Sequence, residues 1–197
     1  TLFPYTTLFR SWSGKCDACG AWNSIIEEAP LSTGPKPLGP KGRAIPLSDL
    51  STQDAALPRA ASGMEELDRV LGGGLVPASA ILVGGDPGIG KSTLLLQAAA
   101  AFARRGVKCL YISGEEAAAQ VRMRAQRLGL QEAPVALGAE TSLRDILTTL
   151  DAERPGLAII DSIQTMWLDT VDSAPGSVSQ VRAAAHELVT FAKRRGV

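Results

Sequence analysis

The sequence predicts an α/β fold in which flanking helices cover a mostly parallel sheet. Short apolar runs alternate with helical segments from residue 80 to the end of the chain, as in parallel strands joined by crossover helices. A glycine-rich stretch at residues 85–93 (GDPGIGKST) lies between an apolar run and a helical segment. A later apolar run, at residues 157–161 (LAIID), ends in an acid. Both features fall at predicted strand ends, where sheets of this kind place their functional residues.

We divide the chain into three parts. Residues 1–28 contain a partial zinc-finger motif, and residues 1–11 (TLFPYTTLFRS) share no pattern with the rest. We interpret residues 1–11 as an artefact of sequence assembly, with a strand or a disordered leader as alternatives. Residues 29–57 have the proline- and glycine-rich composition of a linker. Residues 58–197 form the α/β core, which we expect to be truncated because the chain stops where another strand would begin.

The cysteines indicate half of a zinc ribbon. Cys16 and Cys19 have CxxC spacing, and Gly20 favours the tight turn that lets two thiolates converge. A structural zinc site needs four ligands, and the sequence contains no second CxxC pair. We therefore predict an incomplete zinc site, with two free thiols on a loop as the alternative. Cys109 lies inside an apolar run and is interpreted as a small core residue.

Caps and apolar runs predict the first half of the core. Ser62 is expected to cap a short helix with an apolar stripe that includes Val70, ended by the glycines at 72–74. Residues 80–83 (AILV) predict a strand buried on both faces. Residues 92–105 predict a helix that ends at Gly106. Residues 107–112 (VKCLYI) predict a second buried strand.

The second half of the core shows the same kinds of signal. Residues 115–128 predict a helix that stops at Gly129, and residues 134–137 a short strand. Residues 142–153 predict an amphipathic helix ended by Pro155. They are followed by a predicted strand at 157–161, a loop at 165–177, and a helix at 178–195 that Gly196 closes.

Residues 85–93 fit the pattern GxxxxGK[ST], which predicts a binding site for the phosphates of ATP. Glycines let the backbone wrap closely enough for its N–H groups to point at a triphosphate. Lys91 would place its charge at the β- and γ-phosphates, and Ser92 would place its hydroxyl on Mg²⁺. The alternative is a glycine-rich turn that matches by chance. The predicted ATP-contacting residues are Gly85, Asp86, Pro87, Gly88, Ile89, Gly90, Lys91, Ser92 and Thr93.

Two acids follow neighbouring predicted strands. Asp161 is predicted to hold Mg²⁺ directly or through water; the alternative is an acid that caps the next turn. Glu115 is predicted to orient or deprotonate a water in line with the γ-phosphate. We prefer it to Glu116 because it lies nearer the strand. The alternative is that both glutamates lie in the first turn of a helix, where the helix dipole favours them.

Composition excludes several classes of protein. Lys+Arg and Asp+Glu number 20 each, so any DNA-binding surface must be local. No apolar run is long enough to span a membrane, and the N-terminus lacks the features of a signal peptide. We therefore expect a cytoplasmic protein with no membrane partner.

Three other features of the sequence are interpreted as structural. The basic residues 193–195 are interpreted as a solvated helix end rather than a DNA contact. His186 is interpreted as a surface or packing residue, and Trp167 as a loop anchor or a base-stacking residue.

Five segments in order carry a resemblance to a known family: CDACGAWN, GGGLVPASAILVGGDPGIGKSTLLLQ, YISGEE, IIDSIQTM and SAPGSVSQVR. Together they resemble the RadA (Sms) family of bacterial DNA repair proteins, which are RecA-like P-loop ATPases with an N-terminal four-cysteine zinc motif. The resemblance covers about residues 12–197. It implies a RecA-like core, and the chain ends before the family's KNRFG motif and its Lon-protease-like C-terminal domain.

The resemblance also implies a function. It implies a DNA-stimulated ATPase of recombinational repair that drives branch migration or unwinding and is a homo-hexamer when full length. Single-stranded or branched DNA and a RecA-type recombinase would be its partners, and ATP, Mg²⁺ and, in intact members, Zn²⁺ its cofactors. The alternatives are a nucleotide-gated assembly or regulatory protein without motor activity, and an ATP-binding fragment that is inactive on its own.

The resemblance assigns roles by position. Glu115 looks like the water-activating glutamate and Asp161 like the Mg²⁺ acid. Cys16 and Cys19 match the second cysteine pair of the zinc motif. The SAPGSVSQVR segment, with Arg182, would border a central DNA channel.

Overall fold

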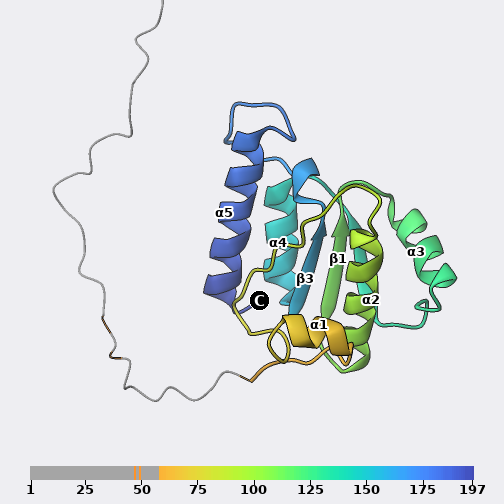
Figure 1. Ribbon diagram of the computed structural model, residues 1–197. Helices are drawn as coiled ribbons and strands as arrows, with labels where there is room; N and C mark the ends of the chain where they lie inside the picture. The colour runs from red at the N-terminus through yellow and green to blue at the C-terminus, as the bar shows by residue number, and fades with distance from the viewer. Residues whose placement is uncertain (1–46, 48, 50–57) are drawn as a thin grey trace, which may run out of the picture. The chain divides into compact units, whose positions relative to one another are not determined.

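The computed structural model describes residues 47, 49 and 58–197. The predicted zinc-binding segment, with Cys16 and Cys19, and most of the predicted linker lie outside the described residues. Nearly all of the described residues belong to the α/β core, which Figure 1 shows from its first helix to the C-terminus.

A parallel sheet of three strands forms the centre of this core, with strand order β2-β1-β3. Strand β1 spans Cys109–Ser113, β2 spans Val135–Ala139 and β3 spans Leu157–Asp161. All five residues of β1 are buried, because this strand pairs with a neighbour on each side. In its register, Ser113 lies opposite both Ala139 and Asp161. The predicted parallel sheet with flanking helices is confirmed.

Helices cover both faces of the sheet (Figure 1). Helices α2 (Lys91–Arg104) and α3 (Ala118–Arg127) lie on one face. Helices α4 (Leu143–Glu153) and α5 (Val178–Arg195) lie on the other. The short helix α1 (Glu65–Val70) and a 3-10 turn at Ile163–Thr165 complete the helical elements of the described residues. None of these helices combines the length and apolar character needed to cross a membrane, as far as residues 47, 49 and 58–197 show.

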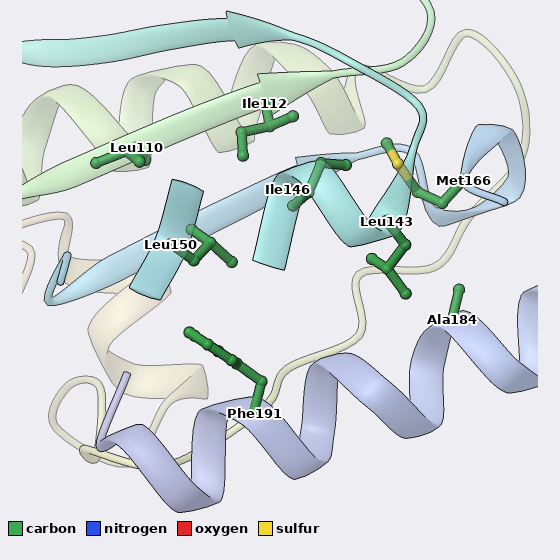
Figure 2. Close-up of a cluster of buried hydrophobic side chains, with 8 residues drawn as sticks. All are labelled: Leu110, Ile112, Leu143, Ile146, Leu150, Met166, Ala184 and Phe191. Atoms are coloured by element: carbon green, nitrogen blue, oxygen red, sulfur yellow. The ribbon is translucent and has the colours of Figure 1, made fainter. Parts of the chain in front are cut away.

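The two core layers follow from the alternation of side chains along β1. Leu110 and Ile112 point to the α4–α5 side, where they pack against Leu143, Ile146 and Phe191 among others (Figure 2). The residue between them, Tyr111, points the other way, because successive strand residues face opposite sides of a sheet. Tyr111 accordingly packs with Leu96 of α2 and Val121 of α3 on the opposite face.

Local signals set several of the helix ends. The Ser142 hydroxyl accepts a hydrogen bond from the N–H of Asp145 at the start of α4, and the Ser177 hydroxyl accepts one from Gln180 at the start of α5. Gly196 ends α5 with φ at 77°, a backbone conformation that glycine adopts without steric cost. The predicted bounds of α5 and β3 agree with those observed.

The predicted strand at residues 80–83 is wrong. This segment has no strand structure, and the exposed fractions of Ile81 and Leu82 are 51% and 84%. A strand needs ladder hydrogen bonds from a neighbour, and within the described residues the sheet consists of β2, β1 and β3 alone. The apolar run therefore predicted the composition of a strand but not a partner for it.

Two helix predictions also need correction. Helix α1 is shorter than expected: its N-cap is Met64 rather than Ser62, and Val70, expected in the apolar stripe, is 72% exposed. Helix α3 begins at Ala118 and not at residue 115. Glu115 and Glu116 therefore lie in the loop between β1 and α3, and the alternative that placed them in the first turn of a helix is wrong.

Candidate functional site

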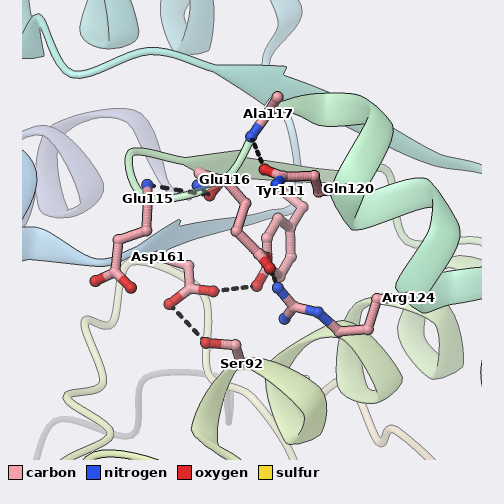
Figure 3. Close-up of polar contacts among 9 residues, drawn as sticks. Ser92, Tyr111, Glu115, Glu116, Ala117, Gln120, Arg124 and Asp161 are labelled. Atoms are coloured by element: carbon pink, nitrogen blue, oxygen red, sulfur yellow. Dashed lines mark hydrogen bonds and ion pairs between the residues drawn. The ribbon is translucent and has the colours of Figure 1, made fainter.

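The candidate site lies at the carboxyl ends of β1 and β3, beside the first turn of α2 (Figure 3). The register that sets Ser113 opposite Asp161 brings the residues after these two strands together. The N–H of Gly114 donates to the Asp161 carbonyl at 2.9 Å and extends this pairing by one residue. Three chain segments that are distant in sequence thus meet at one edge of the sheet, as ligand sites of parallel sheets do.

Asp161 connects β3 to α2 and β1 through its two carboxylate oxygens. The Ser92 hydroxyl donates to Oδ1 at 3.1 Å, and the Tyr111 hydroxyl donates to Oδ2. Asp161 is 8% exposed and Tyr111 is fully buried. Burial raises the pKa of the Tyr111 hydroxyl, and the hydrogen bond and charge of Asp161 raise it further.

The glycine-rich loop leads into α2 through positive φ angles. Gly88 and Gly90 have φ values of 81° and 97°; a side chain at Gly88 would meet no atom within 4 Å, so backbone conformation and not space requires glycine there. Gly90 cannot cap α2 with a side chain, so no side chain of the N-cap residue binds the first N–H groups of the helix. The Lys91 ammonium donates to the carbonyls of Gly85 and Asp86 at 2.8 and 2.9 Å, which folds the lysine over the loop.

Glu115 is held by the residue that follows β3. The Ser162 hydroxyl donates to Oε1 of Glu115 at 2.5 Å, and the Gln164 side chain lies 3.1 Å from the same hydroxyl. The Ser113 hydroxyl accepts from the N–H groups of Glu115 and Glu116 at 3.3 and 2.9 Å and so fixes the turn after β1. The carboxylate of Glu115 therefore has a defined position next to Asp161 (Figure 3).

Glu116 turns away from Glu115 toward α3. Its carboxylate pairs with the guanidinium of Arg124, whose side chain is 12% exposed. The Nη1 atom of Arg124 is buried and has no hydrogen-bond partner in the part of the chain that the structure describes. The two adjacent glutamates thus have different partners, one on β3 and one on α3.

The oxygens of Ser92 and Asp161 suit a hard divalent cation. Mg²⁺ binds to proteins through one or two oxygen ligands and keeps several waters. A hydroxyl and a carboxylate 3.1 Å apart beside an uncapped helix N-terminus provide such a set. Within residues 47, 49 and 58–197, no three His, Cys, Asp or Glu side chains form a metal-binding group. The fit to Mg²⁺ therefore rests on a small oxygen donor set that leaves room for phosphate and water.

Sequence reasoning missed Tyr111, Ser162 and Arg124. Tyr111 lies in the apolar run at residues 107–112, which predicted only a buried strand. A tyrosine in a buried strand needs a hydrogen-bond partner for its hydroxyl, and this was the signal that could have identified it. Ser162 follows the strand-ending acid directly, where the register with β1 gives it access to Glu115. Arg124 carried no local signal, because its pairing with Glu116 depends on where α3 begins.

The other residues singled out from sequence lie elsewhere. Trp167 exchanges backbone hydrogen bonds with Thr141 and Leu143 at 3.0 Å, which anchors the loop after the 3-10 turn. Arg182 and His186 are exposed on α5. Arg195, at the end of the basic run, pairs with Asp151 of α4 at 2.7 Å.

Known proteins align with this chain over nearly its whole length. The family described as "ATPase: KaiC" matches residues 60–155. The chain is 53% identical over 195 residues to DNA repair protein RadA of Brucella abortus, an alignment that covers 94% of this chain and 42% of that protein. The chain belongs to the RadA family.

Two further RadA proteins show the same extent of similarity. The chain is 48% identical over 199 residues to DNA repair protein RadA of Escherichia coli, covering 96% of the chain and 43% of that protein. It is 46% identical over 193 residues to DNA repair protein RadA of Pseudomonas aeruginosa, an alignment that covers 95% of the chain and 42% of that protein. The chain therefore spans less than half the length of these RadA relatives, and its α/β core has the RecA-like fold of the family.

Proposed function

We propose that this chain is the ATP-binding part of a DNA repair ATPase. The observation that carries the proposal is the 3.1 Å contact between Ser92 and Asp161. It joins the residue after the phosphate-loop lysine to the acid at the end of β3. These are the two residue types that hold Mg²⁺ in phosphate-loop enzymes.

Each residue of the site has a role in this proposal. The N–H groups of residues 85–93 would bind the phosphates at the start of α2, where the helix dipole favours negative charge. Lys91 would leave the carbonyls that it now contacts and bind the β- and γ-phosphates. Ser92 and Asp161 would hold Mg²⁺, which neutralises charge on the phosphates when it is bound. Glu115 would orient a water for attack and accept its proton.

The names of the relatives support a role in DNA repair. We propose, for the whole protein, an ATPase stimulated by single-stranded or branched DNA that drives branch migration or unwinding. A homo-hexamer, a RecA-type recombinase partner and a cytoplasmic location belong to the same proposal. Cys16 and Cys19 would supply two zinc ligands, with Zn²⁺ bound only where a second pair completes the site.

The match to the KaiC family favours a second candidate. In this second candidate, the protein would use ATP binding to gate assembly or regulation and would need no DNA. The same phosphate loop, acid and glutamate would serve both functions. The two candidates differ in one measurable property, which is the response of ATP hydrolysis to DNA.

ATP binding is the first test. A fluorescent ATP analogue is titrated into the wild-type chain, Lys91→Ala and the matched control Lys108→Ala, whose exposed lysine pairs with Glu153 away from the site. We expect Lys91→Ala to weaken binding by roughly tenfold to hundredfold, as loss of a charged hydrogen bond does, and the control to match wild type. Equal affinity of all three chains would refute the proposed site.

DNA dependence is the second test. ATP hydrolysis by a full-length RadA protein is measured at low salt with and without single-stranded DNA, because phosphate contacts weaken as salt rises. Stimulation by DNA supports the motor. ATP turnover that DNA does not change would favour the nucleotide-gated regulator.

A further inference from the structure

Tyr111 occupies a place that packing alone does not explain. It lies at the centre of β1, is fully buried, and packs among apolar residues of α2, α3 and β3. A phenylalanine would fill the same volume there. The hydroxyl is not required for this packing, and it donates a hydrogen bond to Oδ2 of Asp161 (Figure 3).

The two oxygens of Asp161 have separate partners. Tyr111 donates to Oδ2 from the buried side, and Ser92 contacts Oδ1 at 3.1 Å from α2. A carboxylate without the first bond can rotate about its terminal torsion, for which preferences are broad. With the bond in place, only Oδ1 is left to face the first turn of α2.

We infer that Tyr111 is a positioning residue that fixes the rotation of the Asp161 carboxylate and so sets the affinity of the site for Mg²⁺. The inference rests on the proposed function, because it assigns a partner to the metal-holding acid of that site. Groups that orient a metal ligand typically change metal affinity by 10–100-fold when they are removed.

Tyr111 is suited to act as a permanent donor. Its hydroxyl contacts a carboxylate oxygen, which can only accept, so Tyr111 is the donor of this bond. One other charged group lies near the hydroxyl, the guanidinium of Arg124, and Arg124 in turn pairs with Glu116. The hydroxyl thus lies between a carboxylate on β3 and a partly buried cation on α3.

The test separates nucleotide binding from metal binding. A fluorescent ATP analogue is titrated into the full 197-residue chain, first in EDTA and then over a series of Mg²⁺ concentrations. We expect Tyr111→Phe to bind the analogue in EDTA as wild type does. It should need roughly tenfold more Mg²⁺ to reach half of the metal-dependent gain in affinity. A Mg²⁺ midpoint equal to that of wild type would overturn the inference.

A control variant and a double-mutant cycle show whether the change in the Mg²⁺ midpoint arises from the contact between Tyr111 and Asp161. Cys109→Ala, which changes a buried residue on the same face of β1, should leave the Mg²⁺ midpoint unchanged. Asp161→Asn should weaken the Mg²⁺ response by itself, and Tyr111→Phe should add little to it. Fully additive effects would overturn the inference, because independent sites add and coupled ones do not.

A second measurement does not need the phenylalanine variant to fold. The chain contains two tyrosines, so 3-fluorotyrosine in a Tyr5→Phe background gives one ¹⁹F signal, from residue 111. That signal should shift when Mg²⁺ is added to the ATP-bound chain, and a signal that Mg²⁺ leaves unmoved would overturn the inference. A wild-type chain whose ATP affinity does not respond to Mg²⁺ would instead overturn the proposed function and the inference with it.

Discussion

The hydroxyl of Ser162 donates to Oε1 of Glu115 at 2.5 Å. Ser162 is the first residue after β3, and Glu115 is the second residue after β1. The contact therefore depends on the parallel register that sets Ser113 opposite Asp161. It gives the proposed water-orienting acid a fixed position relative to the proposed metal-holding acid.

Replacing this serine should affect the rate of the reaction rather than binding. We expect Ser162→Ala to lower the single-turnover rate of ATP hydrolysis by roughly tenfold to hundredfold, because small errors in the position of a reacting group are costly. ATP affinity should stay the same, and Ser162→Thr should recover much of the rate. Thr149→Ala, which removes an exposed hydroxyl on α4, is the control. An Ala variant that hydrolyses ATP at the wild-type rate would contradict the prediction.

Acid should release the contact between Asp68 and the turn before α1. The Asp68 carboxylate accepts from the N–H and hydroxyl of Ser62 and from the N–H of Gly63, each at 2.8 Å. These bonds, led by that from the Ser62 N–H, lower the pKa of Asp68 below its ordinary value of 3.8. A lowered pKa gives stability that is present above the ordinary value and is lost as pH falls through the folded one.

Thermal unfolding between about pH 2.5 and pH 6 measures this contribution. Wild type should be more stable than Asp68→Asn near pH 6, and the difference should shrink as pH falls below about 4. Glu65→Gln changes an acid in the first turn of the same helix and controls for the general effect of charge. A difference that is constant over the whole range would show that the Asp68 contacts contribute no pH-dependent stability.

Local signals in the sequence predicted the elements whose ends are set by nearby residues. The predicted helix at residues 142–153 with Pro155 as its stop, and the predicted helix at residues 178–195 with Gly196 as its terminator, match α4 and α5 closely. The segment at residues 80–83 has an equally strong apolar signal and forms no strand. A strand depends on a neighbour that is distant in sequence, and a local pattern contains no information about that neighbour.

The same distinction applies to the candidate site. Lys91, Ser92 and Asp161 could be predicted as site residues because their spacing relative to strands and glycines is a local pattern, and the structure brings Ser92 and Asp161 into contact. Tyr111 and Ser162 make their contacts through the register of β1 with β3. Nothing within a few residues of either one predicts that contact.

The thiol of Cys109 should be unreactive in the folded chain. Its side chain is 1% exposed, and burial raises its pKa to about 11. Only the thiolate reacts with disulfide reagents, so at pH 8 the reactive fraction is roughly a hundredfold below that of an ordinary cysteine. In a Cys16→Ser, Cys19→Ser chain, Ellman's reagent should label residue 109 only after denaturation. Adding Ala152→Cys on the exposed side of α4 provides a reactive control. Rapid labelling of the native Cys16→Ser, Cys19→Ser chain, which has only Cys109, would contradict the prediction.

Replacing the side-chain N–H donors of Gln180 should lower the stability of the fold. Gln180 lies at the start of α5 and is 2% exposed. Its Nε2 atom lies within 3.1 Å of the carbonyl oxygens of Leu168, Val171 and Ser173. Its Oε1 atom accepts a hydrogen bond from the N–H of Leu168. In Gln180→Glu a carboxylate would face three carbonyl oxygens, which should cost about 3 kcal/mol and lower the Tm by roughly 6–12 °C. Gln126→Glu, on the exposed surface of α3, is the matched control. The cost should be smaller near pH 4, where the protonated side chain of the variant can donate one hydrogen bond, and a Tm equal to that of the control at pH 7 would show that Gln180 does not hold the loop.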